Sequence, residues 1–399
     1  MINNIVFFVA SPLTNRDYER YGAEIFLGNG FNVFFYDVSP YLYPELHKKS
    51  VLHDRYDGDN VTSFYSKHEI IGSIKDLSKD TFVIFLMHYR VNSFFIYSYL
   101  SKLNLNYAIS ILNIIPNYPS SVRVIARHYL QISKFKPSAI ISKIKNIIFS
   151  ARFAKYLGIK SPSMLLLGGK ASINHHQAAL ANVETKNLWL HTFDYDNYLN
   201  EVNNDKKINS KVTKKAVFID SPSPRFKKDA LIPGISNPLT EERFYPSLCR
   251  LFDEIESHLG VSVQIAGHPG SNHSLNPEYF GGRLTFSGNT CEMIKGADIV
   301  INRNSTAMNY AVIYNKPLIF ITSNEAKKSN WLSSGITLMA SSVGKIPINI
   351  DSLDNINWND HNKIDKDAYS WYFQEYIKSN GNGQKYLWQI VASKIKELY

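Results

Sequence analysis

Cysteine is almost absent from this chain: its 399 residues include two, Cys249 and Cys291. Two cysteines exclude a disulfide-stapled framework and a zinc site built from four cysteines. Such sparse use of cysteine is typical of a reducing compartment, so we expect a cytoplasmic protein. The chain also lacks an apolar run of about 18 residues, which a membrane-spanning helix needs. The segment Met1–Ala10 contains no basic residue and predicts a first strand rather than a signal peptide.

Acidic residues are missing from a long stretch of the sequence. From Thr81 to Val183 there is no Asp or Glu, whereas twelve Lys and Arg lie there, and the net charge of the whole chain is +10. This distribution predicts either a solvated basic face or a surface that meets anionic lipid or a polyanionic acceptor. No nucleic-acid-binding motif accompanies the charge, so we expect no nucleic-acid partner.

Part of the basic stretch has helical periodicity. The segment begins at Ile140 and has apolar side chains on one helical face. Cations occupy its other positions, and Gly158 is the expected stop. A basic amphipathic helix most often covers a core, and contact with a membrane is the alternative. The apolar face consists of Ile140, Ile144, Ile147, Ile148 and Ala151.

Apolar strand candidates alternate with helix candidates in both halves of the chain. This order is typical of βαβ units and a parallel sheet, and 44% hydrophobic residues are enough for packed cores. The strand candidates are Ile5–Ala10, Asn32–Tyr36, Phe82–Met87, Val122–Ala126, Met164–Leu167, Ala216–Ile219, Val261–Ala266, Leu284–Ser287, Ile299–Ile301 and Leu318–Ile321. The helix candidates include Asp17–Leu27, Tyr245–Leu259, Cys291–Lys295, Ala307–Tyr314 and Ala368–Tyr399, the last broken at Gly381–Gly383.

A polar, lysine-rich break at residues 203–215 separates the two series and predicts a linker. The sequence therefore predicts an α/β protein with two Rossmann-like domains, residues 1–210 and 211–399. This is the GT-B arrangement, in which two parallel sheets face a central cleft. We expect the C-terminal helices to be able to pack back on the first domain. A fold of this kind does not by itself define a reaction.

Two strand candidates of the second half end in small and polar residues. One leads to His268 and Pro269, and the other leads to Ser305 and Thr306. Ligands bind beyond the carboxyl ends of strands in open α/β sheets, and N–H groups at a helix start can hold an anion. Each pair alone has a structural explanation, as a histidine bonded to loop carbonyls or as a helix cap. Together they predict a nucleotide-phosphate site.

Three further features are candidates for the cleft. Asp220 ends the first strand after the linker, where a carboxylate can act as a nucleophile on a sugar carbon or cap the next loop. The stretch Asp194-Tyr-Asp can hold a divalent metal, although such short matches are common by chance and a capped helix start explains them too. Gly168-Gly169-Lys170 lacks the spacing of a P-loop; it either brings backbone close to a ligand or makes a structural turn.

At these positions the chain resembles bacterial GT-B glycosyltransferases that use CMP-activated nonulosonic or octulosonic acids. Bacterial sialyltransferases of this type hold CMP with a His-Pro motif and a Ser-Ser or Ser-Thr motif, which His268-Pro269 and Ser305-Thr306 match. The retaining β-Kdo transferases of polysaccharide assembly are similar in the strand that ends at Asp220 and in the Asp-Tyr-Asp stretch before the linker.

The resemblance implies that residues 211–399 bind a CMP-sugar donor and residues 1–210 bind a glycan or lipid-linked glycan acceptor. The two CMP motifs would stabilise the donor phosphate without a metal, so we expect no cofactor. Asp220 would form a covalent glycosyl intermediate, which gives retention. Arg303 would pair with the carboxylate of the sugar. Ser221 departs from the acidic residue that often follows such an aspartate.

The implied function is transfer of Kdo or a related 2-keto acid sugar in capsule, O-antigen or lipopolysaccharide assembly. The protein would be cytoplasmic and peripheral on the inner face of the cytoplasmic membrane, with an anionic membrane surface as a partner. The remaining acceptor or cleft candidates are Gly168, Gly169, Lys170 and Asp194.

Three other functions are compatible with the same residues. One is an inverting, sialyltransferase-like enzyme with a base elsewhere in the cleft. Another is a metal-dependent UDP-sugar transferase that uses Asp194 and Asp196. The third is a non-catalytic, membrane-associated assembly factor whose basic half carries its function.

Overall fold

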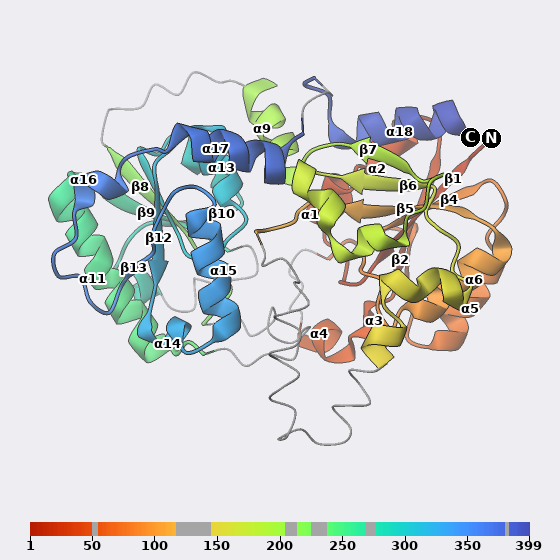
Figure 1. The fold of residues 1–399 in the computed structure, drawn as a ribbon, viewed down its shortest axis with the longest axis horizontal. Coiled ribbons are helices and arrows are strands. Elements are labelled where there is room, and N and C mark those ends of the chain that lie inside the picture. Colours follow the sequence, from red (N-terminus) through yellow and green to blue (C-terminus); the bar gives the residue numbers. More distant parts are fainter. Residues whose placement is uncertain (50–54, 117–144, 204–213, 225–237, 269–276, 380–382) are drawn as a thin grey trace. The chain divides into compact units, whose positions relative to one another are not determined.

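The computed structural model describes residues 1–49, 55–116, 145–203, 214–224, 238–268, 277–379 and 383–399. The chain divides into two compact units, each built on one parallel sheet (Figure 1). The predicted α/β class with two Rossmann-like sheets is therefore confirmed. The first unit consists of Met1–Ile114, Tyr118–His191 and Gly381–Tyr399, and the second of Ile115–Asn117 and Thr192–Asn380. The division thus falls after His191, whereas the sequence placed the boundary at residue 210.

The sheet of the first unit has seven parallel strands in the order β3-β2-β1-β4-β5-β6-β7. β4 and β6 are buried along their whole length, as expected for parallel strands that are covered on both faces. Between β1 and β4 the direction of strand addition reverses, which creates a topological switch point. The strands are β1 (Asn4–Val9), β2 (Asn32–Asp37), β3 (Val61–Ser63), β4 (Thr81–Phe85), β5 (Asn106–Ile111), β6 (Met164–Leu167) and β7 (Lys186–Trp189).

Helices cover the faces of this sheet (Figure 1). A reciprocal capping box of Ser66 and Glu69 begins α5, a device that satisfies two otherwise unpaired backbone donors. The helices are α1 (Asn15–Arg20), α2 (Ala23–Gly28), α3 (Ser39–Leu42), α4 (Pro44–Lys49), α5 (Lys67–Lys75), α6 (Phe94–Leu103), the 3₁₀ segments η2 (Ala151–Leu157), η3 (Lys170–Asn174) and η4 (His176–Leu180), and the C-terminal α18 (Leu387–Leu398).

The last helix of the chain, α18, packs on α2 within the first unit. Trp388 is buried against Phe7, and its indole Nε1 donates a hydrogen bond to the carbonyl oxygen of Arg20 over 2.8 Å. Gly22 has a φ of +69°, and a Cβ there would lie 2.4 Å from the Trp388 ring. The helix expected over Asp17–Leu27 is therefore split into α1 and α2 at the glycine on which the tryptophan packs.

The sheet of the second unit has six parallel strands in the order β10-β9-β8-β11-β12-β13. These are β8 (Lys215–Ile219), β9 (Ser262–Gly267), β10 (Thr285–Ser287), β11 (Ile299–Asn302), β12 (Leu318–Thr322) and β13 (Ile348–Asn349). The helical segments are α9 (Phe193–Asn203), α11 (Glu241–Leu259), η6 (Pro277–Phe280), α12 (Thr290–Lys295), α13 (Met308–Ile313), α14 (Asn324–Lys327), α15 (Asn330–Ser341), α16 (Trp358–His361), α17 (Lys366–Tyr372) and the π-helical η7 (Phe373–Ile377).

Several sequence predictions fall partly or wholly on undescribed positions, among them most of the linker expected at residues 203–215. The expected strand Val122–Ala126 lies outside the described residues, as does the first part of the helix expected from Ile140. The end of that segment is described: the helical residues end at Ile148, Ser150 is extended, and a separate 3₁₀ segment, η2, ends at Gly158 with a φ of +75°. The glycine is therefore a helical stop, as predicted, but it ends η2 and not one continuous helix.

Candidate functional site

The carboxyl edge of the second sheet brings together the residues predicted to carry chemistry in the second half. β8 has β9 on one side and β11 on the other. Asp220 follows β8, His268 follows β9, and the segment with Ser305 and Thr306 follows β11. Because the chain passes from β8 to β9 and later returns to β11 on the opposite side, this edge is a topological switch point, where open α/β sheets bind ligands.

Asp220 is held at the end of β8 by its neighbour β9. Its side chain is only 5% exposed. The backbone N–H of Asp220 donates to the carbonyl oxygen of Ala266 over 3.0 Å, and the backbone N–H of His268 donates to Asp220 Oδ2 over 3.4 Å. The half-buried His268 and the buried carboxylate are therefore fixed against each other. Pro269 lies outside the described residues.

Ser305 and Thr306 lie just before a helix, as the sequence predicted, but neither residue is its cap. α13 begins at Met308 with Ala307 as its cap. Ser305 instead lies in a turn that Asn302 closes: its N–H donates to Asn302 Oδ1 over 3.1 Å, and the amide of Asn302 donates to the carbonyl oxygen of Ser305 over 3.3 Å. Such local side-chain bonds compete with helix capping. Thr306 is exposed beside this turn.

Arg303 bridges the loops that follow β8 and β11. Its guanidinium is buried, and Nη2 donates to the carbonyl oxygen of Ser223 over 2.6 Å while Nε donates to Asn304 Oδ1 over 3.1 Å. The same guanidinium lies over the ring of Phe244, 4.9 Å from the ring centroid. Arg303 therefore ties together the two segments that flank the switch point.

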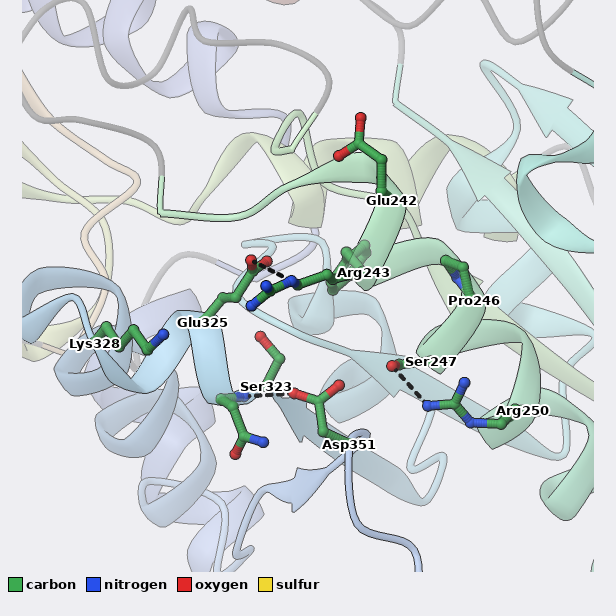
Figure 2. Close-up of a pocket in the computed structure, with 11 residues that line it drawn as sticks. Glu242, Arg243, Pro246, Ser247, Arg250, Ser323, Glu325, Lys328 and Asp351 are labelled. Atoms are coloured by element: carbon green, nitrogen blue, oxygen red, sulfur yellow. Dashed lines mark hydrogen bonds and ion pairs between the residues drawn. The ribbon is translucent and has the colours of Figure 1, made fainter.

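A cavity of about 270 Å³ lies farther along the same edge, where β12 and β13 end (Figure 2). Phe244, which contacts Arg303, also lines it. Figure 2 shows Arg243 directed toward Glu325, and the two form an ion pair of 3.8 Å. No sequence motif indicated this cavity. Its walls consist of Glu242, Arg243, Phe244, Pro246, Ser247, Arg250, Ser323, Asn324, Glu325, Lys328 and Asp351.

Asp194 and Asp196 lie in the first turn of α9. Residues two apart on a helix do not face each other, so the pair does not present two carboxylates to one metal ion from that helix. Asp194 is buried and accepts a hydrogen bond of 2.8 Å from the amide of Asn309, whose Oδ1 accepts one of 3.0 Å from Tyr372 OH. This carboxylate joins α9, α13 and α17 within the second unit.

The glycine turn after β6 has a packing explanation. A Cβ on Gly168 would lie 2.4 Å from the carbonyl oxygen of Leu112, so only glycine fits there. Gly169 is buried and precedes η3, and Lys170 is exposed. The turn directs the chain into η3 and η4, which carry His175 and His176 to the carboxyl edge of the first sheet.

Three histidines gather at that edge. His88 follows β4, and one ring nitrogen of each of His88, His175 and His176 lies within 4.8 Å of the other two. Among the described residues, this is the group whose donor atoms could hold a metal ion by composition. The sequence reasoning missed it; a His-His doublet just after a strand and a glycine turn was the available signal.

Desolvation lowers the pKa values of these imidazoles, although His88 and His176 remain exposed and His175 is half-buried. Desolvation lowers the pKa of His88 to about 4, with the charges of Arg90 and His176 adding to the effect. Desolvation, followed by the charges of the other two histidines, lowers the pKa of His175 to about 3. The pKa of His176 is lowered by desolvation and by Arg90. The lowered pKa values favour uncharged rings at neutral pH.

The basic stretch of the first unit is partly described. Ile147, Ile148, Phe153 and Tyr156 are all exposed, beside Lys155, whose Nζ lies 4.8 Å from the Tyr156 ring centroid. Among the described helices, none has the length and apolarity needed to cross a membrane. Outside the described residues lie the cations Arg123, Arg127, Lys134, Lys136 and Lys143.

Comparison with known proteins gives a fold. No protein family model matches the chain, and no curated protein matches it in sequence. Solved structures do match along nearly the whole chain. UDP-GlcNAc 2-epimerase of Methanocaldococcus jannaschii, in complex with UDP-GlcNAc and UDP, is similar with a TM-score of 0.50 and 11% identity, covering 100% of both chains.

Two further solved structures are similar to about the same extent. The calicheamicin glycosyltransferase CalG4 has a TM-score of 0.54 and 8% identity, covering 100% of this chain and 98% of its own. The wall teichoic acid polymerase TagF has a TM-score of 0.52 and 14% identity, covering 99% and 90%. With the two parallel sheets, these matches give the chain the glycosyltransferase-like, two-domain GT-B fold.

Proposed function

We propose that this protein is a glycosyltransferase that moves Kdo, or a related 2-keto acid sugar, from its CMP-activated donor to a glycan acceptor of capsule, O-antigen or lipopolysaccharide assembly. One observation carries the proposal. Asp220, His268 and the Ser305 turn occupy the carboxyl ends of three adjacent strands at the switch point of one sheet. The second unit would bind the donor, and the first unit the acceptor.

The donor has one phosphate, and the residues at this edge suit it. His268 and the turn of Ser305 and Thr306 offer a side-chain donor, hydroxyls and backbone N–H groups on either side of β8. Such preorganised donors stabilise charge that develops on a leaving phosphate. In this proposal Arg303 is the counterion of the sugar carboxylate. Its hydrogen bond to the carbonyl oxygen of Ser223 holds it against the loop that follows Asp220.

Asp220 is the nucleophile of the proposed reaction. Its carboxylate oxygen forms a bond to the anomeric carbon while the bond from that carbon to the CMP phosphate breaks, and CMP leaves as an anion. The acceptor hydroxyl then attacks the same carbon, loses its proton to solvent and releases the Asp220 carboxylate. Two inversions in sequence give net retention. The metal-dependent alternative has less support, because Asp194 and Asp196 lie two residues apart on α9.

A nucleotide panel and mass spectrometry test the proposal together. Calorimetry with CMP, UDP and GDP should show CMP binding with no divalent metal present. Intact-protein mass spectrometry with a CMP-sugar and no acceptor should show one added sugar residue, which Asp220→Asn should abolish. The control Asp298→Asn changes an exposed carboxylate at the opposite end of β11 and should keep the adduct.

Each contrary result selects another function. Preference for UDP with inhibition by EDTA would favour the metal-dependent UDP-sugar enzyme. An inverted product without an adduct would favour the sialyltransferase-like mechanism. Failure to bind any of the three nucleotides would favour a non-catalytic assembly factor.

A further inference from the structure

The histidine cluster of the first unit is organised by one buried amide, Gln177. Its Oε1 accepts a hydrogen bond of 2.9 Å from the backbone N–H of Tyr89, which fixes the orientation of the amide. The Nε2 of Gln177 therefore lies against Nδ1 of His88, 2.8 Å away, as a donor. The backbone N–H of Gln177 donates to Nδ1 of His175 over 3.4 Å, so that His175 caps η4.

These bonds determine where the ring protons lie. A neutral imidazole that accepts at Nδ1 carries its proton on Nε2. His88 and His175 therefore each have an Nε2–H donor. The lowered pKa values of both rings agree with this neutral form.

This placement of hydrogen-bond donors and acceptors disfavours a metal ion at the histidine cluster. A metal-ligating histidine normally donates its other ring N–H to a carbonyl or carboxylate, which leaves a lone pair on the ligating nitrogen. Here Gln177 donates instead of accepting, for both His88 and His175. A metal ion bound to Nδ1 of either ring would displace Gln177. A metal ion bound to Nε2 would leave the ring proton on Nδ1, where it would meet an N–H group of Gln177.

The charge around the cluster favours an anion. Arg90 is exposed and lies two residues after His88 in the chain, and its charge contributes to the lowered pKa values of His88 and His176. Its side chain makes no ion pair with any described residue. The sequence from Thr81 to Val183 contributes no carboxylate to this surface. His88 also follows β4, which borders the switch point of the first sheet, where open α/β sheets bind ligands; His175 and His176 follow β6 at the same edge.

We infer that His88, His175 and Arg90 form a binding site for an oxyanion, the phosphate or carboxylate group of the acceptor glycan. The two Nε2–H groups donate to its oxygens, and the Arg90 guanidinium neutralises its charge. The identity of the ligand as an acceptor rests on the proposed function, whereas the oxyanion site itself does not. Hydrogen bonds to a charged group contribute about 1.5–3 kcal/mol each, which predicts a tenfold or greater loss of affinity for each donor removed.

Nitrogen NMR of the full-length protein with labelled histidine tests the site. The resonances of His88 and His175, assigned from the single variants His88→Gln and His175→Gln, should show the neutral Nε2–H tautomer at pH 7. Titration with inorganic phosphate should shift both. His88→Gln, His175→Gln and Arg90→Gln should each weaken phosphate binding about tenfold or more, whereas His68→Gln, an exposed histidine of α5, should not.

A parallel titration with acetate distinguishes the two sources of the oxyanion. Tighter binding of phosphate assigns a phosphorylated acceptor, and equal or tighter binding of acetate assigns a carboxylated one. The proposal is overturned if neither anion shifts these resonances, if both rings carry their proton on Nδ1, or if Zn²⁺ binds stoichiometrically through all three histidines. CMP calorimetry on the same samples separates the two hypotheses: intact CMP binding without anion binding rejects this site alone, and the reverse rejects the proposed donor.

Discussion

The carboxyl edges of the two sheets occupy the same topological position in two similar folds, yet they carry opposite chemistry. In the second unit the edge holds buried groups that are charged in their ordinary states, Asp220 and Arg303, each bonded to backbone of a neighbouring segment. In the first unit it holds imidazoles with lowered pKa values, two of which are oriented by Gln177. The proposed roles fit this difference: a nucleophilic carboxylate is served by a fixed, preorganised environment, whereas the proposed acceptor site combines neutral imidazole donors with the exposed Arg90.

The largest effect that would sharpen this contrast is on turnover. Asp220→Asn keeps the volume of the side chain but replaces the carboxylate by an amide, which is a poor nucleophile. We expect transfer to fall by about a thousandfold or more, since such a loss corresponds to roughly 4 kcal/mol of transition-state stabilisation. CMP affinity and melting temperature should change little. Near-wild-type turnover would show that Asp220 is not the nucleophile, and the proposed contrast between the two sheet edges would then fail.

The next effect concerns the donor phosphate. His268→Ala should weaken CMP binding roughly 10- to 150-fold, because a hydrogen bond to a charged group contributes about 1.5–3 kcal/mol. The backbone N–H that donates to Asp220 remains in this variant, so the fold should persist. Isothermal calorimetry makes the measurement, with His175→Gln in the first unit as the matched control. Equal loss in both variants would contradict the division of roles between the two edges.

Local pattern predicted the strands well and the sites only in part. Met164–Leu167 was predicted with the observed bounds because four buried apolar residues are followed by a glycine turn. β3 and β7, by contrast, are short edge strands with exposed positions and no continuous apolar run. The split of the first helix at Gly22 depends on Trp388, which no local signal reveals.

The candidate sites show the same limit. The sequence places Asp220 and His268 at strand ends, which is enough to predict that they lie at one edge. It does not show that Asn302 closes the turn of Ser305 in place of a helix cap. The histidine cluster needs β4 and η4 to come together through Gln177 and Tyr89, a contact between residues far apart in the chain.

Acid should destabilise the first unit through its histidines. In the folded protein the pKa of His88 is about 4 and that of His175 about 3, below the ordinary value of 6.5. Between these values the unfolded chain binds more protons, so stability is complete above pH 6.5 and falls as the pH is lowered toward 4. We expect the melting temperature to drop by a few degrees across this window.

The variant that tests this linkage replaces both rings. His88→Gln combined with His175→Gln should flatten the dependence of melting temperature on pH between 4 and 6.5. The matched control is His68→Gln, at an exposed histidine of α5. Calorimetric scans at several pH values give the comparison. An unchanged slope in the double variant would show that other groups account for acid sensitivity.

The smallest effect per residue concerns the exposed basic and aromatic surface of the first unit, which we propose contacts an anionic membrane. Each Lys or Arg near such a bilayer contributes about 1 kcal/mol, so Lys155→Gln should weaken binding to phosphatidylserine vesicles only about fivefold. Tyr156→Ser removes an exposed ring and should weaken binding to a similar extent.

The salt dependence of binding is the second test. The screening length falls to about 3 Å at 1 M salt, so the attraction between charges is largely lost and co-sedimentation with the vesicles should vanish at that salt concentration. The matched control is Lys327→Gln on α14 of the second unit. Binding that is indifferent to salt, or lost equally in the control, would mean that this surface is a solvated basic face.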